Sequence, residues 1–212
     1  MTDRTPNAGA AQAFWDERYG QRPQIWSGNP NFILVREIAD LVPGSALDLG
    51  CGEGGDAIWL AERGWLVTAV DISGTAISRG RAQAAAVGLA DRISWRQHDL
   101  SRSFPSGSFD LVSAQYLHSP MEFPRGQVLR AAAGAVAPRG TLLVGGHAEH
   151  PEWAEEQHRS HHLPSLEEVL GSLELVPGEW EVQAMENFER AVNDSAGNPA
   201  VRVDNVLRLK RM

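Results

Sequence analysis

Acidic residues follow short apolar runs at three places in the first half of the chain, namely Asp48, Asp71 and Asp99. The first of them opens a glycine-rich stretch, Asp48-Leu49-Gly50-Cys51-Gly52-Glu53-Gly54-Gly55. Glycines let the backbone turn sharply and let a ligand lie against bare main chain. The amides that begin a following helix suit an anion such as a carboxylate. This stretch therefore predicts a binding site for a small polar ligand.

Two kinds of ligand fit the glycine turn. Gly50, Gly52 and Gly55 match the dinucleotide fingerprint G-x-G-x-x-G. Asp48, however, precedes the first glycine by two residues, where a carboxylate would repel a pyrophosphate and attract an ammonium group. Asp71 lies about twenty residues further on, the spacing at which an acid meets ribose hydroxyls. A dinucleotide contains a ribose, and so does a nucleoside ligand that carries an ammonium group. Asp71 therefore indicates a nucleoside without choosing between these two ligands.

Two of the strand-end acids, Asp71 and Asp99, can be interpreted further. Asp71 could instead cap the helix that follows it, although Ser73 is a good alternative cap. Asp99, at the end of a third strand, can accept a hydrogen bond from an adenine amino group.

The elements that position these acids follow from the periodicity of the apolar residues. The pattern predicts strands over 45–49, 65–70, 93–97, 109–114 and 141–146, alternating with helices over 57–63, 75–87 and 125–137. A turn at Pro138-Arg139-Gly140 leads into the last of these strands, and the capping box Ser165-Leu166-Glu167-Glu168 opens a further helix to Leu173. Such alternation produces a doubly wound α/β fold with a mostly parallel sheet and helices on both faces. Its ligand lies beyond the carboxyl ends of the strands. Two final strands, 180–190 and 201–210, complete seven strands with a C-terminal antiparallel hairpin, a Rossmann-like architecture.

The chain before the first strand divides in two. Residues 1–13 are small and polar, and we expect them to be a flexible N-terminus before a single domain over 14–212. Residues 14–44 carry several aromatic residues early in the chain. They form either a helix packed on the sheet edge or a lid over the ligand, because aromatic faces attract cations. The residues that would form this lid are Trp15, Tyr19 and Trp26.

Five of the seven histidines follow the fifth strand: His147, His150, His158, His161 and His162. Interleaved glutamates make a metal site conceivable, because imidazole and carboxylate are good ligands. The spacing matches no closed template. We therefore predict a substrate-side insertion over 147–175 that holds no metal, with no loss of melting temperature in the presence of a chelator.

The composition narrows the class of partner. Lys and Arg total 19 against 27 for Asp and Glu, a formal charge of −8, and this disfavours a nucleic-acid substrate. Cys51 is the single cysteine, so no intrachain disulfide forms. The sequence shows neither a leader nor an apolar run long enough to span a membrane. We expect a cytoplasmic monomer or homodimer that acts on a small molecule, not on nucleic acid or a membrane.

Several motifs together resemble those of class I S-adenosylmethionine (SAM) methyltransferases over nearly the whole chain. They are Leu47 to Gly54, Val70-Asp71-Ile72-Ser73, His98-Asp99-Leu100, Ser108 to Val112, Pro138 to Leu143 and the terminal hairpin. The early Phe14-Trp15-Asp16-Glu17-Arg18-Tyr19 is similar to small-molecule methyltransferases of the thiopurine and tellurite-resistance type. The Asn-Pro-Pro-Tyr signature of amino-methylating nucleic-acid enzymes is replaced by Ser113-Ala114-Gln115-Tyr116.

The resemblance implies SAM as cofactor, S-adenosylhomocysteine (SAH) as product, and a role for each motif residue. Asp48 would orient the amino group of SAM, and its methionine part would lie against Gly50, Cys51 and Gly52. The ribose hydroxyls and the adenine would contact Asp71, Ile72, Asp99 and Leu100. Gln115 and Tyr116 would lie near the sulfonium, and the site would be closed by Trp15, Tyr19 and Trp26.

Methyl transfer is an in-line displacement, so the protein must chiefly align the nucleophile and exclude water. A base is needed only where the nucleophile arrives protonated, and His118 and His147 are the candidates, with Tyr116 as a third catalytic residue. We predict a small-molecule acceptor, which a fold does not identify. The alternatives are a protein or RNA modifier, an NAD-dependent oxidoreductase, and a SAM-binding module without turnover.

Overall fold

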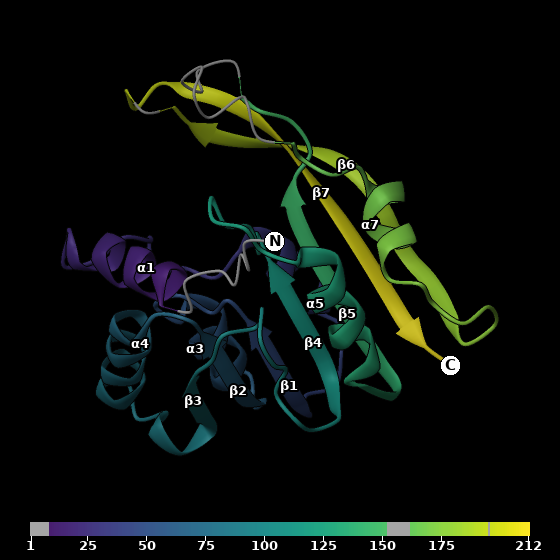
Figure 1. Cartoon of the computed structure of the whole chain (residues 1–212), viewed down its shortest axis with the longest axis horizontal. Helices are drawn as coiled ribbons and strands as arrows, with labels where there is room; N and C mark the ends of the chain where they lie inside the picture. Colours follow the sequence, from purple (N-terminus) through teal and green to yellow (C-terminus); the bar gives the residue numbers. More distant parts are fainter. Residues whose placement is uncertain (1–8, 152–161, 195) are drawn as a thin grey trace, which may run out of the picture.

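The computed structural model describes residues 9–151, 162–194 and 196–212 (Figure 1). Its helices are α1 (Ala10–Gly20), α2 (Phe32–Ile38), α3 (Gly55–Glu62), α4 (Gly74–Ala86), the 3-10 turn η1 (Ala90–Arg92), α5 (Arg125–Gly134) and α7 (Leu166–Ser172). Its strands are β1 (Ser45–Leu49), β2 (Leu66–Asp71), β3 (Ile93–Gln97), β4 (Phe109–Gln115), β5 (Val136–His147), β6 (Trp180–Asn193) and β7 (Pro199–Arg211).

The strands form one seven-stranded sheet in the order β3-β2-β1-β4-β5-β7-β6. The pairs from β3 through to β5 are parallel, whereas β7 pairs antiparallel with both β5 and β6. This confirms the predicted fold class, including the C-terminal hairpin. The strand order reverses between β1 and β4, the place where ligands bind in open α/β sheets.

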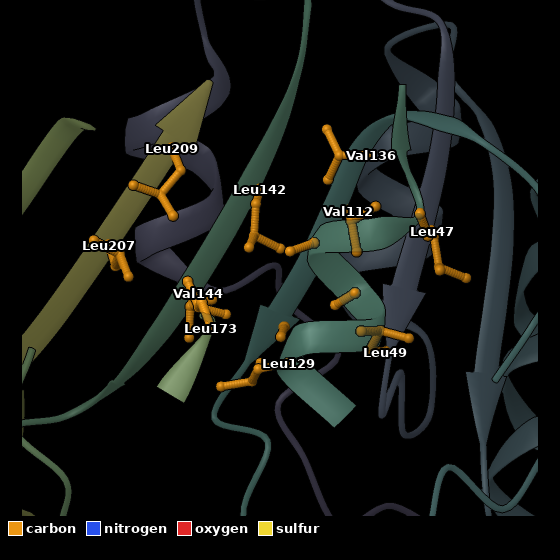
Figure 2. Packing of buried hydrophobic residues seen from close by; sticks show 14 of the residues in the cluster. Leu47, Leu49, Val112, Leu129, Val136, Leu142, Val144, Leu173, Leu207 and Leu209 are labelled. Atoms are coloured by element: carbon orange, nitrogen blue, oxygen red, sulfur yellow. The ribbon is translucent and has the colours of Figure 1, made fainter. Parts of the chain in front are cut away.

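The two faces of the sheet are covered by different helices, because successive side chains of a strand point to opposite faces. In β5, Leu142 and Val144 pack with α5 and α7, and the residue between them, Leu143, packs with α2, α3 and α4. Figure 2 shows the first of these clusters, in which Leu129 of α5 packs with labelled residues of β1, β4, β5 and β7. The parallel part of the sheet is therefore buried on both faces, and ligand access is left to the ends of its strands.

The hairpin β6–β7 extends beyond the carboxyl end of β5 (Figure 1). Its register places Asp204 opposite His147 of β5 and opposite Phe188 of β6, with Arg190 opposite Arg202. Since β7 is antiparallel to β5, its beginning lies at the sheet edge where the parallel strands end. The hairpin thus brings polar side chains to the edge where the strand-end acids lie.

Three local predictions change in the structure. The predicted flexible segment 1–13 is too long, because α1 already begins at Ala10; residues 1–8 lie outside the described part of the chain. The turn predicted at Pro138–Gly140 lies within β5, as a bulge where Arg139 has a φ of 68°. The segment 147–175, predicted as one substrate-side insertion, is not a single unit. Its later part contains α7, whose Leu166 and Val169 belong to the hydrophobic core.

The helix predicted after Ser165 is confirmed as α7, and its capping box is complete. The Ser165 hydroxyl accepts from the Glu168 amide at 3.2 Å, and the Glu168 carboxylate accepts from the Ser165 amide at 2.7 Å. Across the described ranges, no helix combines the length and apolar character needed to cross a bilayer.

Candidate functional site

A cavity of about 1140 Å³ opens at the carboxyl ends of the parallel strands. Its volume exceeds the roughly 300–1,000 Å³ typical of a single small-molecule site, so it has room for two ligands side by side. Every residue predicted for the site lines this cavity: Trp15, Tyr19, Trp26, Asp48, Gly50, Cys51, Gly52, Asp71, Ile72, Asp99, Leu100, Gln115, Tyr116, His118 and His147. The structure therefore brings the predicted set together, while the role of each residue stays a prediction.

Asp48 is the penultimate residue of β1, lines the cavity and is 2% exposed. Its Oδ2 atom has no hydrogen-bond partner. Burial raises the pKa of this carboxyl well above its ordinary value, and the nearby carboxylates of Asp56 and Asp71 raise it further. A buried oxygen without a donor is unfavourable unless a ligand supplies one. This orphaned oxygen fits a cationic ammonium group and disfavours a pyrophosphate.

Asp71 holds the glycine turn against the end of β2. Its Oδ2 accepts a hydrogen bond from the Gly52 amide and its Oδ1 from the Ser73 amide, both at 2.9 Å. Burial raises the pKa of Asp71, although these donors partly offset the effect. The helix α4 is capped by Ser73, whose hydroxyl accepts from the Ala76 amide at 3.1 Å, as predicted. Asp71 is therefore not the cap, and its carboxylate lines the cavity.

Asp99 and Leu100 follow β3 on the same side of the cavity. The Asp99 Oδ1 atom accepts from the Ser101 amide at 2.9 Å and from the Ser101 hydroxyl at 2.6 Å. These bonds fix the carboxylate at the cavity wall. Ile72 lines the cavity between Asp71 and these residues.

Tyr19 and Trp26 lie directly on the glycine turn. The Trp26 indole donates to the Tyr19 hydroxyl at 3.0 Å, and Tyr19 is buried while Trp26 is half exposed. Gly52 has a φ of +53°, and a Cβ atom there would lie 2.9 Å from the Tyr19 hydroxyl oxygen. Glycine is required at this position both by its backbone conformation and by the aromatic residues above it. Trp15 packs next to Tyr19, with ring centroids 6.2 Å apart.

Buried carboxylates attach the N-terminal segment to the glycine turn, and sequence reasoning missed them. Glu53 accepts from the amides of Ile25 and Trp26, each at 3.0 Å, and pairs with Arg79 of α4 at 2.8 Å. Asp56 accepts from the Asn31 amide at 2.6 Å. Both acids belong to the glycine stretch, but nothing in their spacing indicates which distant amides they bind.

Asp16 of α1 makes a third attachment. It accepts from the Ser73 hydroxyl at 2.6 Å and from the Thr75 amide at 3.1 Å, at the start of α4. Burial alone would raise the pKa of Asp16, but these hydrogen bonds outweigh it and lower the pKa. The helix α1 lies beside α4 in Figure 1, so the aromatic residues are both packed on a helix and placed over the cavity.

The opposite end of the cavity contains a second buried acid, Asp204, that sequence reasoning also missed. Its carboxylate accepts from His147 Nδ1 at 2.8 Å, from Arg190 Nε at 2.8 Å and from the Tyr116 hydroxyl at 2.9 Å. Burial would raise the pKa of Asp204, but these three donors lower it. The carboxylate is therefore ionised at neutral pH. Its signal in the sequence is weak, because β7 also contains Arg202, Asn205, Arg208 and Lys210.

Tyr116 connects this network to β4. It has a φ of +50°, and its ring contacts the His147 imidazole in a tilted arrangement, with centroids 4.5 Å apart and an interplanar angle of 43°. Burial and the Asp204 carboxylate raise the pKa of its hydroxyl, which stays protonated. Tyr116 is therefore a hydrogen-bond donor to Asp204 and not a base.

His118 and Gln115 lie between the two ends of the cavity. Burial, with the positive charge of Arg125, lowers the pKa of His118 to about 4, and its Nε2 atom has no partner. His118 is therefore neutral at physiological pH and a weak base. Gln115 donates to the Ser113 hydroxyl at 3.1 Å, which leaves its Oε1 without a partner beside the cavity. Burial also raises the pKa of the Cys51 thiol, so Cys51 is no nucleophile at neutral pH.

The histidine-rich stretch is only partly described. His158, His161 and the glutamates at 152, 155 and 156 lie outside the described residues. His150 lines the cavity, and His162 contacts Glu168 at 3.1 Å. Within the described residues, no three His, Cys, Asp or Glu side chains are grouped closely enough to hold a metal ion.

Comparison with known proteins agrees with this geometry. Residues 46–140 match the methyltransferase domain family. A probable chloroplastic tocopherol O-methyltransferase from Oryza sativa subsp. japonica is 34% identical over 140 residues, 65% of this chain and 38% of the rice protein. The 2-heptyl-1-hydroxyquinolin-4(1H)-one methyltransferase of Mycobacteroides abscessus is 33% identical over 124 residues, 55% of this chain and 54% of that enzyme. The chain thus spans about half or less of the length of these relatives.

Solved structures extend the likeness to the whole fold. A structure concerned with the conversion of a disulfide bond into a thioacetal group during echinomycin biosynthesis superposes with a TM-score of 0.71 and 25% identity, covering 94% of this chain and 92% of that one. TehB from Haemophilus influenzae has a TM-score of 0.68 and 15% identity over 95% of this chain and 67% of its own. Magnesium protoporphyrin IX methyltransferase from Synechocystis PCC 6803, solved with SAH, has a TM-score of 0.64 and 16% identity over 97% of both chains.

The family model shows a methyltransferase domain over residues 46–140, and the reversal of strand order, the glycine turn and the orphaned Asp48 oxygen are consistent with that assignment.

Proposed function

We propose that this protein transfers a methyl group from SAM to a small-molecule acceptor by in-line displacement. The observation that carries the proposal is the buried Asp48 carboxylate with an unpartnered oxygen, beside a glycine turn in a two-ligand cavity. The ammonium group of the methionine part would supply the missing donor. Asp71 and Asp99 would bind the ribose and the adenine edge, and Gln115 would face the reacting end.

The cavity beyond Gln115 would hold the acceptor. Leu117, Met121, Phe123 and Leu163 supply an apolar part of its wall there, beside polar residues that include His118 and His147. Such a wall suits a flat hydrophobic molecule with few polar groups. Two relatives, a probable tocopherol O-methyltransferase and a 2-heptyl-1-hydroxyquinolin-4(1H)-one methyltransferase, are named for acceptors of this kind. The net charge of −8 supports a small molecule over RNA.

Calorimetry tests the cofactor assignment directly. SAM and SAH should bind with micromolar affinity, and NAD should not bind. Asp48→Asn should lose most of this affinity, whereas Asp91→Asn, which removes the same charge from the exposed turn η1, should bind like the parent. Tight binding of NAD without binding of SAM would overturn the proposal in favour of an oxidoreductase.

An acceptor screen with isotopically labelled SAM tests turnover. The panel should contain phenols, hydroxyquinolinones, aryl thiols and cyclic disulfides, the last because a similar structure concerns disulfide conversion. Transfer of label to one of these classes supports the proposal. Binding of SAM without transfer to any member, nor to a peptide or an RNA added as further acceptors, would indicate a binding module instead. The cytoplasmic location and the monomeric or homodimeric state stay predictions.

A further inference from the structure

Two histidines at the acceptor end of the cavity are differently connected. His118 is buried with an unpartnered Nε2 and has a pKa of about 4, because burial and Arg125 disfavour its charged form. His147 keeps 27% of its side chain exposed, lines the cavity, and contacts the carboxylate of Asp204. Only His147 therefore has a fixed counter-charge that would stabilise an imidazolium.

The contact with Asp204 also decides which ring nitrogen of His147 carries the proton. An ionised carboxylate only accepts hydrogen bonds, so His147 Nδ1, 2.8 Å from Asp204 Oδ1, must be the donor. In the neutral ring, Nε2 is then the nitrogen with a free electron pair. This is the atom that can take a proton from a ligand in the cavity.

Asp204 is itself held in place by two further donors. Arg190 Nε at 2.8 Å and the Tyr116 hydroxyl at 2.9 Å both bind Oδ2, so the carboxylate cannot rotate without breaking them. Asp204 is 0% exposed and comes from a different strand than either partner. Each of the three donors offsets part of the cost of removing the carboxylate from water, so together they stabilise Asp204 as a buried charge in a fixed orientation.

We propose that Asp204 is a positioning residue that holds His147 as a general base, and that the acceptor is an aromatic hydroxyl. A thiolate or another anionic nucleophile would need no base, whereas a phenol arrives protonated at neutral pH. The proposal rests on the proposed function, because the base has a purpose only if a methyl group is transferred from SAM.

The proposed step balances as follows. The acceptor O–H bond breaks and its proton moves to His147 Nε2, which becomes an imidazolium paired with Asp204. The oxygen electron pair forms the new O–C bond to the methyl carbon, and the C–S bond breaks with its pair on sulfur, leaving neutral SAH. The imidazolium then returns its proton to water.

Asp204→Asn tests the positioning role. Arg190 and Tyr116 would still donate to one position, so the amide oxygen of the new side chain should turn toward them. Its NH2 group should then face His147 Nδ1 and donate to it, which moves the imidazole proton to Nε2. An orienting acid replaced by its amide produces the wrong tautomer in just this way. His147 Nε2 would then carry a proton and could no longer take one from the hydroxyl group of the methyl acceptor.

Two measurements decide the proposal. Nitrogen-15 NMR of the imidazole rings, assigned with His147→Gln, should show the Nδ1–H tautomer for His147 in the parent and the Nε2–H tautomer in Asp204→Asn. Methylation of naphthol should fall about 100-fold in kcat in Asp204→Asn, at the low end for loss of a general base, with KM little changed. Methylation of naphthalenethiol, which ionises without help, should change little.

The matched control is Asp110→Asn. Asp110 accepts from the Ser45 amide and hydroxyl, at 2.7 and 2.8 Å, outside the cavity, so its loss tests general damage to the sheet. Equal loss of both acceptors in Asp204→Asn, or an unchanged His147 tautomer, would overturn the inference. If the parent methylates neither acceptor, the aromatic-hydroxyl part of the inference is overturned, and the tautomers decide the positioning role. Failure of SAM binding would instead overturn the proposed function. The tautomer of His147 would still show whether Asp204 positions the ring.

Discussion

Two buried carboxylates stand at opposite ends of one cavity and are connected in opposite ways. Asp48 is 2% exposed and has an oxygen without a donor, whereas Asp204 is 0% exposed and receives three donors. Burial raises the pKa of Asp48, and the donors around Asp204 lower its pKa. The difference separates a group that awaits a ligand from a group that holds another side chain in position.

The same difference has a consequence for stability. An unpaired buried carboxylate destabilises the free protein, and a ligand that pairs with it recovers that free energy on binding. A paired buried carboxylate does the reverse, because removing one of its partners leaves a charge that water cannot reach. Substitutions at the two ends should therefore change stability in opposite directions.

Asp48→Asn should have the largest effect. Loss of the charged hydrogen bond to the ammonium group should weaken SAM binding by about 3 kcal/mol, or roughly 100-fold, measured by calorimetry. The free variant should unfold at a higher temperature than the parent at neutral pH. Reduced affinity together with reduced stability would contradict the comparison drawn between the two acids.

The pH dependence of the unfolding free energy tests the contribution of Asp48 to stability. Because the folded pKa of Asp48 lies above its ordinary value of 3.8, the neutral form is favoured in the folded chain. Its contribution to stability is full below pH 3.8 and is lost as the pH rises through the folded pKa. The stability advantage of Asp48→Asn should therefore grow with pH and shrink toward acid, which denaturant unfolding at several pH values can follow.

Arg190→Met should affect the other end of the cavity. Asp204 would keep His147 and Tyr116 but lose its permanent counter-charge. Because the Arg190 side chain is 28% exposed, we expect a loss of about 2 kcal/mol of unfolding free energy, below the value for a fully buried pair. SAM affinity should change little. A large loss of SAM affinity at constant stability would show that the two ends are not separate.

Asp71→Ala should combine both behaviours, because this carboxylate both lines the cavity and holds the glycine turn. The Gly52 and Ser73 amides would lose their acceptor. We expect SAM affinity and unfolding free energy each to fall by about 1.5–2 kcal/mol. A fall in stability alone, with SAM bound as by the parent, would make Asp71 a purely structural residue.

Tyr19→Phe should have the smallest effect. It removes the acceptor of the Trp26 indole hydrogen bond while keeping the ring over Gly52. A neutral hydrogen bond contributes about 1 kcal/mol, so SAM affinity should fall by about fivefold or less. Calorimetry can measure this against Asp91→Asn. An unchanged affinity would remove Tyr19 from the residues that close the site.

The sequence by itself determined the parts of this protein that depend on local pattern. Short apolar runs bounded by turn residues predicted the strands, and the Ser165-to-Glu168 spacing predicted the start of α7, because strand-length apolar runs and capping are both decided within a few residues. Strand ends in a parallel sheet share one edge, so the positions of Asp48, Asp71 and Asp99 around one cavity also followed from the sequence.

Only the tertiary structure decided which of those polar groups are paired. His147 and Asp204 are separated by 57 residues, and the attachment of Ile25 to Glu53 spans 28. Hydrogen bonds over such separations form only after strands and helices have docked, and their geometry depends on register and bulges that no local pattern specifies. The residue types and their spacing predicted a site for a nucleoside ligand. The docking of the hairpin onto β5 decided which histidine lies against a buried acid.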